Sequence, residues 1–337
     1  MPRYREPTRR SHHMFATAVP FQPHTSAPGA RAGVRVLVVA NRASGSAAAL
    51  AAVDLLRQRL SEQGRRVDEL ALVAGQVEEM LRAALSGVTY QAIYVAGGDG
   101  TVLAVVEALA GRSVPIAIIP CGTMNWTARD LGIPLAPEAA IDALLDAEVR
   151  HIDLGRVNGK PFLCACMVGF GSLLARWRER ERARGNSPWV LWPKLVWRGL
   201  SLIQRYRHLR LRLRTAERHE RLRARALVVT ANLIDDRPGP VPRRPRLDAG
   251  QLGLYAVRDA SGVELMRLGM RLMLGTWQQD DALLATSASH AEIGVGRRRA
   301  VSVMCDGERV RLRTPLRFTL ERATVAVLVP RAGRPTV

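Results

Sequence analysis

The sequence is poor in lysine and cysteine, and it has no long apolar run. Of its 50 lysine and arginine residues, only Lys160 and Lys194 are lysine. Four cysteines among 337 residues do not make a disulfide framework, and no CxxC spacing favours a zinc site, so we expect reduced thiols. No stretch reaches the roughly 18 uninterrupted apolar residues of a membrane span. The first residues contain no apolar signal segment, so we expect a cytoplasmic protein.

The composition excludes a disordered or fibrous chain. Hydrophobic residues make up 47% of the sequence, which is enough to form a sizeable core. The length suits two modest domains. Residues 1–32 combine several prolines with polar residues and show no periodicity, so we expect them to form a disordered tail.

The positive charge is concentrated in one segment. The formal net charge is 50 − 30 = +20. Residues 176–225 hold 16 basic and four acidic residues, an excess of +12, whereas residues 33–150 carry a net charge of −3. This asymmetry indicates an anionic partner for the basic segment, either a membrane surface or nucleic acid.

Between residues 33 and 150, strand patterns alternate with helix patterns. Residues 34–40 form a continuous, β-branched apolar run, typical of a strand buried on both faces. The alternation predicts a parallel sheet covered by helices, with ligands at the carboxyl ends of the strands. The expected strands are 34–40, 67–73, 92–96 and 115–119, and the expected helices are 47–60, 77–85 and 102–110.

A glycine-rich turn follows the third expected strand. It reads Gly97-Gly98-Asp99-Gly100-Thr101 and leads into a helix. Glycines let the backbone approach a phosphate closely, and a helix N-terminus supplies free N–H groups. Asp99 would repel a phosphate unless it holds Mg²⁺ or water beside it. The alternative is an ordinary turn in which Asp99 is a helix N-cap.

Two neighbouring strand ends carry similar residues. The fourth expected strand leads to Gly122-Thr123 and Asn125, which offer a hydroxyl and an amide, and the first leads to Asn41, Ser44 and Gly45. Three adjacent ends of this kind predict a phosphate-binding site. Neither GxxxxGK[ST] nor GxGxxG occurs, so the P-loop and dinucleotide fingerprints are both absent.

These motifs together resemble the diacylglycerol kinase catalytic-domain family, which includes bacterial soluble lipid kinases and is related to sphingosine and ceramide kinases. The likeness covers roughly residues 34–330. GGDGT alone is shared with NAD kinases and phosphofructokinases, but its combination with the later motifs is specific. Those motifs are PCGTMNWTARDLGIP at 120–134, HIDLG at 151–155, PFLCACMVG at 161–169, RLDAG at 246–250 and DGE at 306–308.

The resemblance implies a two-domain fold. The expected domains are an NAD kinase-like α/β ATP-binding domain at 33–150 and a mainly antiparallel β domain that binds lipid at 151–337, with the active site between them. The last strand would return to the first domain. Short strand-like runs at 226–231, 252–257, 300–304, 309–312 and 325–329 agree with this division.

The family also implies roles for individual residues. Asp99 would orient Mg²⁺, Asp153 would lie beside the reacting groups, and Glu308 would be the general base that accepts the proton of the lipid hydroxyl. Taken alone, Asp306-Gly307 is a strong hairpin-turn signal. The residues expected to hold ATP are Asn41, Ser44, Gly45, Gly97, Gly98, Asp99, Gly100, Thr101, Thr123 and Asn125.

The chain departs from the family pattern at several positions. Arg42 replaces a proline, Trp126 stands where many members have aspartate, histidine or a small residue, and Cys164 occupies a position that is often asparagine. The family's structural metal beside Asp248 is not expected here, because the neighbouring residue is Ala249.

The basic segment 176–225 also contains four of the six tryptophans, at positions 177, 189, 192 and 197. Tryptophan and arginine together suit the headgroup level of a bilayer, so we expect peripheral binding to an anionic membrane. A solvated helix with its tryptophans in the core is the alternative. No nucleic-acid module accompanies the segment, so we expect no nucleic-acid partner.

The sequence therefore predicts a kinase that uses ATP and Mg²⁺ to phosphorylate a hydroxyl of a membrane lipid. A catalytically weak, nucleotide-binding regulatory protein at the membrane is the main alternative. A kinase of a soluble nucleotide or sugar is the third reading, because GGDGT is shared with such enzymes.

Overall fold

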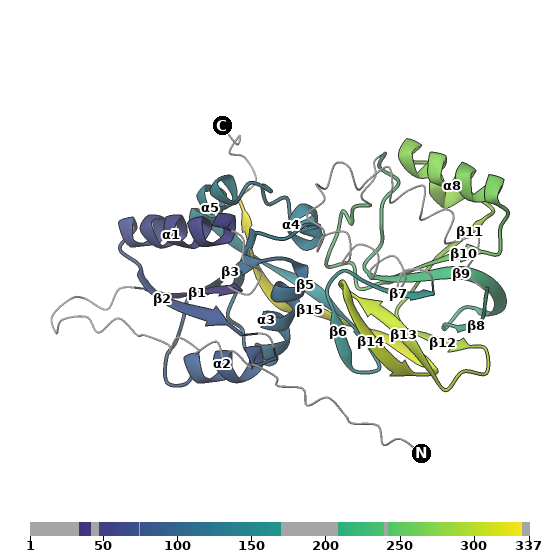
Figure 1. The fold of residues 1–337 in the computed structure, drawn as a ribbon, viewed down its shortest axis with the longest axis horizontal. Coiled ribbons are helices and arrows are strands. Elements are labelled where there is room, and N and C mark those ends of the chain that lie inside the picture. The colour runs from purple at the N-terminus through teal and green to yellow at the C-terminus, as the bar shows by residue number, and fades with distance from the viewer. Residues whose placement is uncertain (1–33, 42–46, 74, 170–207, 239–241, 332–337) are drawn as a thin grey trace, which may run out of the picture.

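The structure is a computed structural model that describes residues 34–41, 47–73, 75–169, 208–238 and 242–331 (Figure 1). Its N-terminal part is a parallel sheet in the order β2-β1-β3-β4. The strands are β1 (Arg35–Asn41), β2 (Arg66–Leu72), β3 (Ala92–Gly97) and β4 (Ile116–Pro120), and the helices are α1 (Ala47–Glu62), α2 (Val77–Ala84), α3 (Asp99–Ala108), α4 (Trp126–Asp130) and α5 (Pro137–Leu145).

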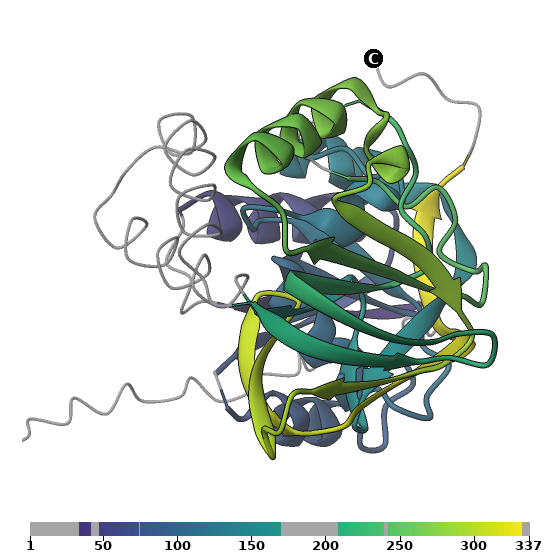
Figure 2. The same ribbon diagram turned by 90° about the vertical axis from the view of Figure 1, so that its right-hand side faces the viewer.

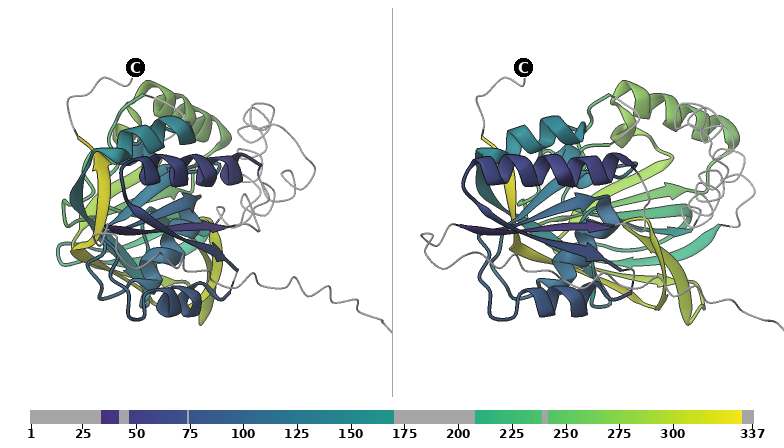
Figure 3. Two further views of the ribbon diagram at one scale, coloured as in Figure 1. Left: turned by 90° about the vertical axis from the view of Figure 1, so that its left-hand side faces the viewer. Right: turned by 60° about the vertical axis from the view of Figure 1, so that its left-hand side comes forward.

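The helices cover both faces of this sheet. Helices α1 and α5 lie on one side and α2 and α3 on the other, as Figures 1 and 3 both show. Every residue of β3 and of β4 is buried, which explains their continuous apolar sequence. The predicted strands and helices are confirmed, except that α3 begins at Asp99, three residues before the expected start, because the glycine turn itself enters the helix.

The C-terminal part is mainly antiparallel, as predicted. Strand β8 shows the alternation of a sheet with one buried face, because Leu209, Leu211 and Leu213 are buried and the arginines between them are exposed. The strands are β5 (Ala147–Val157), β6 (Lys160–Phe162), β7 (Ala165–Gly169), β8 (Leu209–Arg214), β9 (His219–Ala231), β10 (Leu252–Arg258), β11 (Leu283–Ala288), β12 (Ala291–Val295), β13 (Ala300–Cys305), β14 (Glu308–Arg313) and β15 (Leu316–Pro330).

Strand β15 joins the two parts. It pairs with β12 and β5 in antiparallel orientation, and its Val327 is paired in parallel with Ile116 of β4. The hydrogen-bonded path therefore runs without a break from the antiparallel to the parallel region. Strand β5 runs through residue 150 and pairs with β15 along its length. The predicted domain boundaries at 33 and 150 stay a prediction.

Helix α8 (Gly262–Leu274) was not expected from the sequence. It begins with a capping box between Ser261 and Glu264 and ends at Gly275, which adopts the left-handed conformation. A short 3₁₀ helix, η2 (Trp277–Gln279), follows. Figures 1 and 2 show α8 above the antiparallel strands. None of the helices in the described part of the chain is long and apolar enough to cross a membrane.

Candidate active site

A pocket of about 360 Å³ lies where the glycine turns of the parallel sheet face the hairpin β13–β14. Its wall combines segments that are far apart in the sequence. They are 98–101 after β3, 121–124 and Trp126 after β4, 164–165 and Met167 at β7, and Met304 with 306–308 at the β13–β14 turn. The structure thus brings the GGDGT turn, Thr123 and Glu308 to one cavity, although the turn and Glu308 are about 200 residues apart.

The two glycine turns contact each other through their backbones. A Cβ atom on Gly122 would lie 2.5 Å from the Cα atom of Gly98, and a Cβ atom on Gly98 would lie 3.1 Å from the Cα atom of Gly122. Neither position has room for a side chain, which gives a structural reason for glycine in both turns. The close approach leaves backbone N–H groups at the N-terminus of α3 next to the pocket.

Asp99 holds the second turn in place. Its Oδ2 atom accepts a hydrogen bond from the backbone N–H of Trp126, and its Oδ1 atom accepts one from Thr127, each at 3.0 Å. The carboxylate therefore caps α4 rather than its own helix α3, whose N-cap is Gly98 without a side-chain bond. The alternative reading, in which Asp99 is the N-cap of its own helix, is therefore wrong. The carboxylate also lines the pocket, and its contact with Mg²⁺ stays a prediction.

Asn125 braces the turn from within. Its Oδ1 accepts from the N–H of Gly122, and its Nδ2 donates to the carbonyl of Gly122, both at 3.0 Å. The residue has a positive φ of 46°, which asparagine tolerates better than most residues. Asn125 is not among the residues that line the pocket, and its amide is occupied by the turn. This geometry does not support the predicted contact between Asn125 and ATP.

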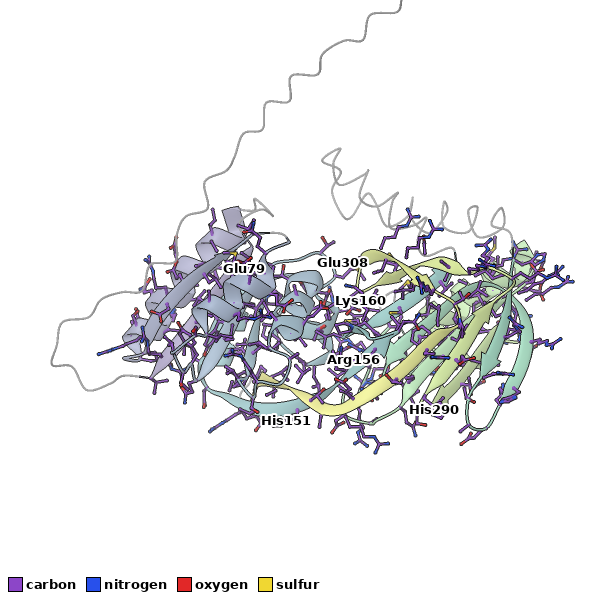
Figure 4. The ribbon with its side chains drawn as sticks, turned by 90° about the horizontal axis from the view of Figure 1, so that it is seen from below. Glu79, His151, Arg156, Lys160, His290 and Glu308 are labelled. Carbon is purple, nitrogen blue, oxygen red and sulfur yellow. The ribbon has the colours of Figure 1, made fainter. Side chains whose placement is uncertain are left out.

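Glu308 is the first residue of β14 and pairs with Cys305 across the hairpin. The two turn residues, Asp306 and Gly307, have φ angles of 45° and 90°, as the Asp-Gly turn signal predicts. The Glu308 side chain reaches the opposite wall, where its Oε1 lies 4.0 Å from the Cβ position of Gly100. Figure 4 shows Glu308 near the middle of the molecule.

Asp306 fixes the hairpin that carries Glu308. Its carboxylate accepts hydrogen bonds from the backbone N–H groups of Leu163, Cys164 and Ala165. Burial outweighs these bonds and raises the pKa of Asp306 to about 6. The sequence motif contained Asp306, but nothing in its spacing indicated that this carboxylate docks the turn onto the start of β7.

A buried ion pair ties α4 to the antiparallel part. The Nε atom of Arg244 lies 2.7 Å from the Oδ2 atom of Asp130, and both side chains are almost completely buried. Arg244 also donates to the carbonyls of Leu163 and Ala231, and its guanidinium lies 5.4 Å from the centre of the Trp126 ring. Sequence reasoning missed this residue, because an arginine in a basic loop carries no signal of burial.

Cys164 and Trp126, two of the departures from the family pattern, line the pocket. Burial raises the pKa of the Cys164 thiol, so we expect it to stay neutral. Its sulfur lies 3.1 Å from the Oγ1 atom of Thr127. The third departure, Arg42, lies outside the described residues.

The structure does not bring every predicted residue to the pocket. Asp153 is buried, and its oxygens accept from the backbone N–H groups of Gly250 and Ala323, so it braces the 247–250 loop against β15. Gly97 does not line the pocket, and a Cβ atom on it would lie 2.7 Å from the Cβ atom of Thr101. Ser44 and Gly45 fall outside the described residues, as does part of the basic segment, residues 176–207. Asn41 ends β1, at the carboxyl edge of the same sheet.

The carboxylates at the pocket fit a magnesium ion held mostly by other ligands. Mg²⁺ in nucleotide sites usually takes one or two protein carboxylates and completes its shell with water and phosphate oxygens. Asp99 and Glu308 supply two such groups, and each Asp99 oxygen keeps a second lone pair beside its hydrogen bond. The described residues contain no cluster of three or more metal-binding side chains.

Glycine turns at the carboxyl ends of parallel strands, facing a pocket with carboxylates, are typical of α/β proteins that bind phosphate groups. Residues 35–157 match the family model for the diacylglycerol kinase catalytic domain.

Curated relatives match part of the chain. A protein from Pseudomonas aeruginosa named "Probable lipid kinase YegS-like" is 49% identical over 110 residues, which are 32% of this chain and 32% of that protein. A protein from Mycobacterium tuberculosis named "Diacylglycerol kinase" is 38% identical over 157 residues, 44% of this chain and 50% of that protein. The matches thus span between a third and a half of these relatives.

The fold as a whole resembles solved structures. A structure described as a diacylglycerol kinase from Bacillus anthracis matches with a TM-score of 0.67 and 19% identity, covering 88% of this chain and 98% of that one. The match confirms the predicted fold class, a parallel α/β region followed by a mainly antiparallel β region.

Proposed function

We propose that this protein is a lipid kinase that uses ATP and Mg²⁺ to phosphorylate a hydroxyl of a diacylglycerol-like or sphingoid-like membrane lipid. The observation that carries the proposal is the shared pocket of the two glycine turns and Glu308. The match of residues 35–157 to the family model for the diacylglycerol kinase catalytic domain supports the reaction class. The names of the relatives support a lipid acceptor.

The pocket residues divide into two roles. The backbone N–H groups at the start of α3, with the hydroxyls of Thr101 and Thr123, would hold the nucleotide phosphates. Glu308 stands on the opposite wall, where it would accept the proton of the lipid hydroxyl. Asp306 positions Glu308 through the turn, and Asp99 positions the second phosphate-binding turn.

Asp99 would also contribute a carboxylate to magnesium, as its place in the pocket allows. When bound, the ion would neutralise charge on the transferring phosphate. The chain's own contribution is to fix the carboxylate, because two backbone N–H groups leave Asp99 one orientation. Asp153 would support the fold near the cleft rather than touch the reacting groups.

A membrane-bound substrate requires the protein to reach the bilayer, so we propose peripheral membrane association. The basic segment 176–225 supports this, and so does helix α8. Its outer face is apolar, with exposed fractions of 79% for Val263, 61% for Met266 and 60% for Met270. Its inner residues Leu268 and Leu272 pack on the cluster around Tyr255 and Trp277. An apolar outer face on a packed helix suits shallow insertion at a bilayer surface.

Flotation with phosphatidylglycerol vesicles tests this part. Changing Met266→Gln together with Met270→Gln should reduce the vesicle-bound fraction severalfold. The matched control, Leu50→Gln with Val149→Gln, removes two exposed apolar side chains elsewhere and should leave binding unchanged. Equal vesicle binding by the wild type, the α8 variant and the control variant would exclude α8 as the inserting element.

The reaction is tested with the purified protein, γ-labelled ATP, Mg²⁺ and vesicles that each contain one candidate lipid. Diacylglycerol, a sphingoid base, ceramide and phosphatidylglycerol form the panel. We expect label in at least one lipid. No label in any of them, with a known diacylglycerol kinase active in parallel, would refute the proposal.

A catalytically weak, nucleotide-binding regulatory protein is the second candidate. Trp126 and Cys164, two of the departures from the family pattern, line the pocket itself and support this reading. ATP binding and vesicle binding without label transfer would favour it.

A further inference from the structure

A second cavity, wider than the candidate active site, lies away from it. It is a groove of about 970 Å³ on the antiparallel part, formed by β8, β9, β12, the 296–300 turn and the end of β14. It shares no lining residue with the pocket that contains Glu308. Seven arginines line it, and we call it the arginine groove. They are Arg212, Arg214, Arg221, Arg313 and the three residues 297–299.

The groove's acidic residues do not neutralise these arginines. Glu220 and Glu292 are the two acidic residues in its wall. Glu292 pairs with Arg317 at 3.3 Å. Glu220 pairs with Arg218 at 3.4 Å and with Arg258 at 3.8 Å. All three of these arginines lie outside the groove wall, so the positive charge of the groove stays uncompensated.

The groove arginines themselves have no acidic partner within the described part of the chain. Arg212 makes one long contact, from its guanidinium to the carbonyl of Gly296 at 3.4 Å. For the other six side chains, no ion pair or hydrogen bond occurs among residues 34–331 as described. Their guanidinium donors are therefore available to a ligand.

Strand pairing concentrates like charges at this place. Arg212 lies directly opposite Arg221 in the β8–β9 ladder, and the exposed face of β8 continues with Arg214. Like charges that face each other across strands destabilise a sheet. On the other side Arg212 faces Gly294 of β12, where a Cβ atom would lie 3.2 Å from the Nε atom of Arg212. The glycine therefore leaves the Arg212 side chain room to lie along the groove.

A distant segment completes the cluster. Residues 297–299 follow β12, and Arg313 ends β14, so three separate parts of the chain deliver arginines to one concave surface. His290, labelled in Figure 4, directly precedes β12 and marks the entry to that strand. A solvated charged surface requires no such convergence, whereas a concave arginine site matches the geometry of phosphate oxygens.

We propose that the arginine groove binds a ligand that carries several phosphate groups. A single phosphate needs only one or two guanidinium groups for its oxygens. Seven guanidiniums around 970 Å³ suit a polyphosphate or several neighbouring phosphate headgroups. The shared chemistry is clustered phosphate, supplied either by a soluble polyphosphate or by an anionic phospholipid surface. The proposal does not depend on kinase activity.

The hairpin β8–β9 provides a matched pair of variants. Arg212→Gln with Arg221→Gln removes one cross-strand pair from the groove. Arg210→Gln with Arg223→Gln removes the next cross-strand pair of the same hairpin, which is also exposed but does not line the groove. Both double variants lose the same charge. A third variant, Arg298→Gln with Arg299→Gln, probes the opposite wall. Thermal unfolding checks that all three fold.

Titration calorimetry measures the binding of inorganic tripolyphosphate, the soluble source, to the full chain. The buffer contains about 0.15 M salt to suppress diffuse electrostatic attraction. Sedimentation with phosphatidylglycerol vesicles, against phosphatidylcholine vesicles, measures the lipid source. For the probe that binds, we expect the dissociation constant to rise at least tenfold in both groove variants. We expect less than a twofold rise in the Arg210/Arg223 control.

The outcomes separate the alternatives. Selective loss of tripolyphosphate binding assigns a soluble polyphosphate, and selective loss of vesicle binding alone assigns headgroups. Equal weakening in the groove and control variants would show general charge attraction and overturn the proposal. If the groove variants keep full binding of every probe that binds the wild type, the probes bind elsewhere, including the candidate active site, and the proposal is also overturned. So would the failure of both probes to bind.

Discussion

The ion pair between Asp130 and Arg244 offers a sharp test of how the two parts of the molecule are held around the pocket. Asp130 ends α4, whose N-terminus is capped by Asp99, and Arg244 reaches the start of β7 through the Leu163 carbonyl. We expect Asp130→Asn and Arg244→Met, each alone, to destabilise the protein strongly.

The magnitude follows from burial. Burial raises the pKa of Asp130 even though Arg244 lies beside it, so desolvation outweighs the attraction of the pair. Such a pair adds little net stability, but removing one partner leaves a buried charge without compensation, which costs about 3–5 kcal/mol. The double variant Asp130→Asn with Arg244→Met leaves no lone charge. It should therefore lose less than the sum of the two single losses, by at least about 2 kcal/mol.

Urea denaturation of the wild type, both single variants and the double variant measures this coupling. The lost hydrogen bonds from Arg244 to the Leu163 and Ala231 carbonyls keep the double variant below the wild type. Single losses under about 1 kcal/mol, or strictly additive losses, would show that the pair is not the buried connection described here.

Two further predictions concern the turns that build the pocket. Gly122→Ala places a Cβ atom 2.5 Å from the Gly98 Cα atom. We therefore expect the free energy of unfolding, measured by denaturation, to fall by about 1–3 kcal/mol. We expect the affinity for ATP, measured by calorimetry, to fall at least tenfold. Its control, Gly269→Ala in α8, meets nothing within 4 Å and should stabilise by about 0.5–1 kcal/mol; similar behaviour of both variants would contradict the turn contact. Because the pKa of Asp306 rises from 3.8 to about 6 on folding, its contribution to stability is complete below pH 3.8 and disappears as the pH rises through 6. The free energy of unfolding of the wild type, relative to that of Asp306→Asn, should therefore fall by about 1–3 kcal/mol between pH 4 and 7. We expect a value near the lower end, because Asp306 is partly exposed. A difference that does not change with pH, in denaturation curves measured across this range, would refute the prediction.

The parallel part of the fold was readable from the sequence because its signals are local. Continuous apolar runs predicted β3 and β4, and the glycine turns after them indicated a ligand site at the carboxyl edge of the sheet. Helix α8 was missed, although Ser261 and Glu264 form a capping box, because apolar residues on both its faces blur the helical period. The return of β15 to β4 came from family resemblance, since one strand serving both parts leaves no periodic mark.

The candidate site was predictable only in part. Glu308 and the GGDGT turn meet as the resemblance implied, but the roles of neighbouring residues depend on contacts between distant segments. Asp99 caps the helix of another turn, and Asp153 accepts from a loop nearly 100 residues away. Arg244 finds Asp130 across 114 residues. Such pairings depend on the packed structure, and no spacing in the sequence records them.

The central claim is that the pocket formed by the glycine turns and Glu308 transfers phosphate. The most direct measurement compares ATP affinity with the single-turnover rate of label transfer to lipid in Glu308→Gln. Glu79→Gln, an exposed change on α2 to the left of Glu308 in Figure 4, is the control. We predict that Glu308→Gln binds ATP within twofold of the wild type while transfer slows by about 10²–10⁴-fold, and that Glu79→Gln matches the wild type. Transfer at the wild-type rate in Glu308→Gln would contradict the account.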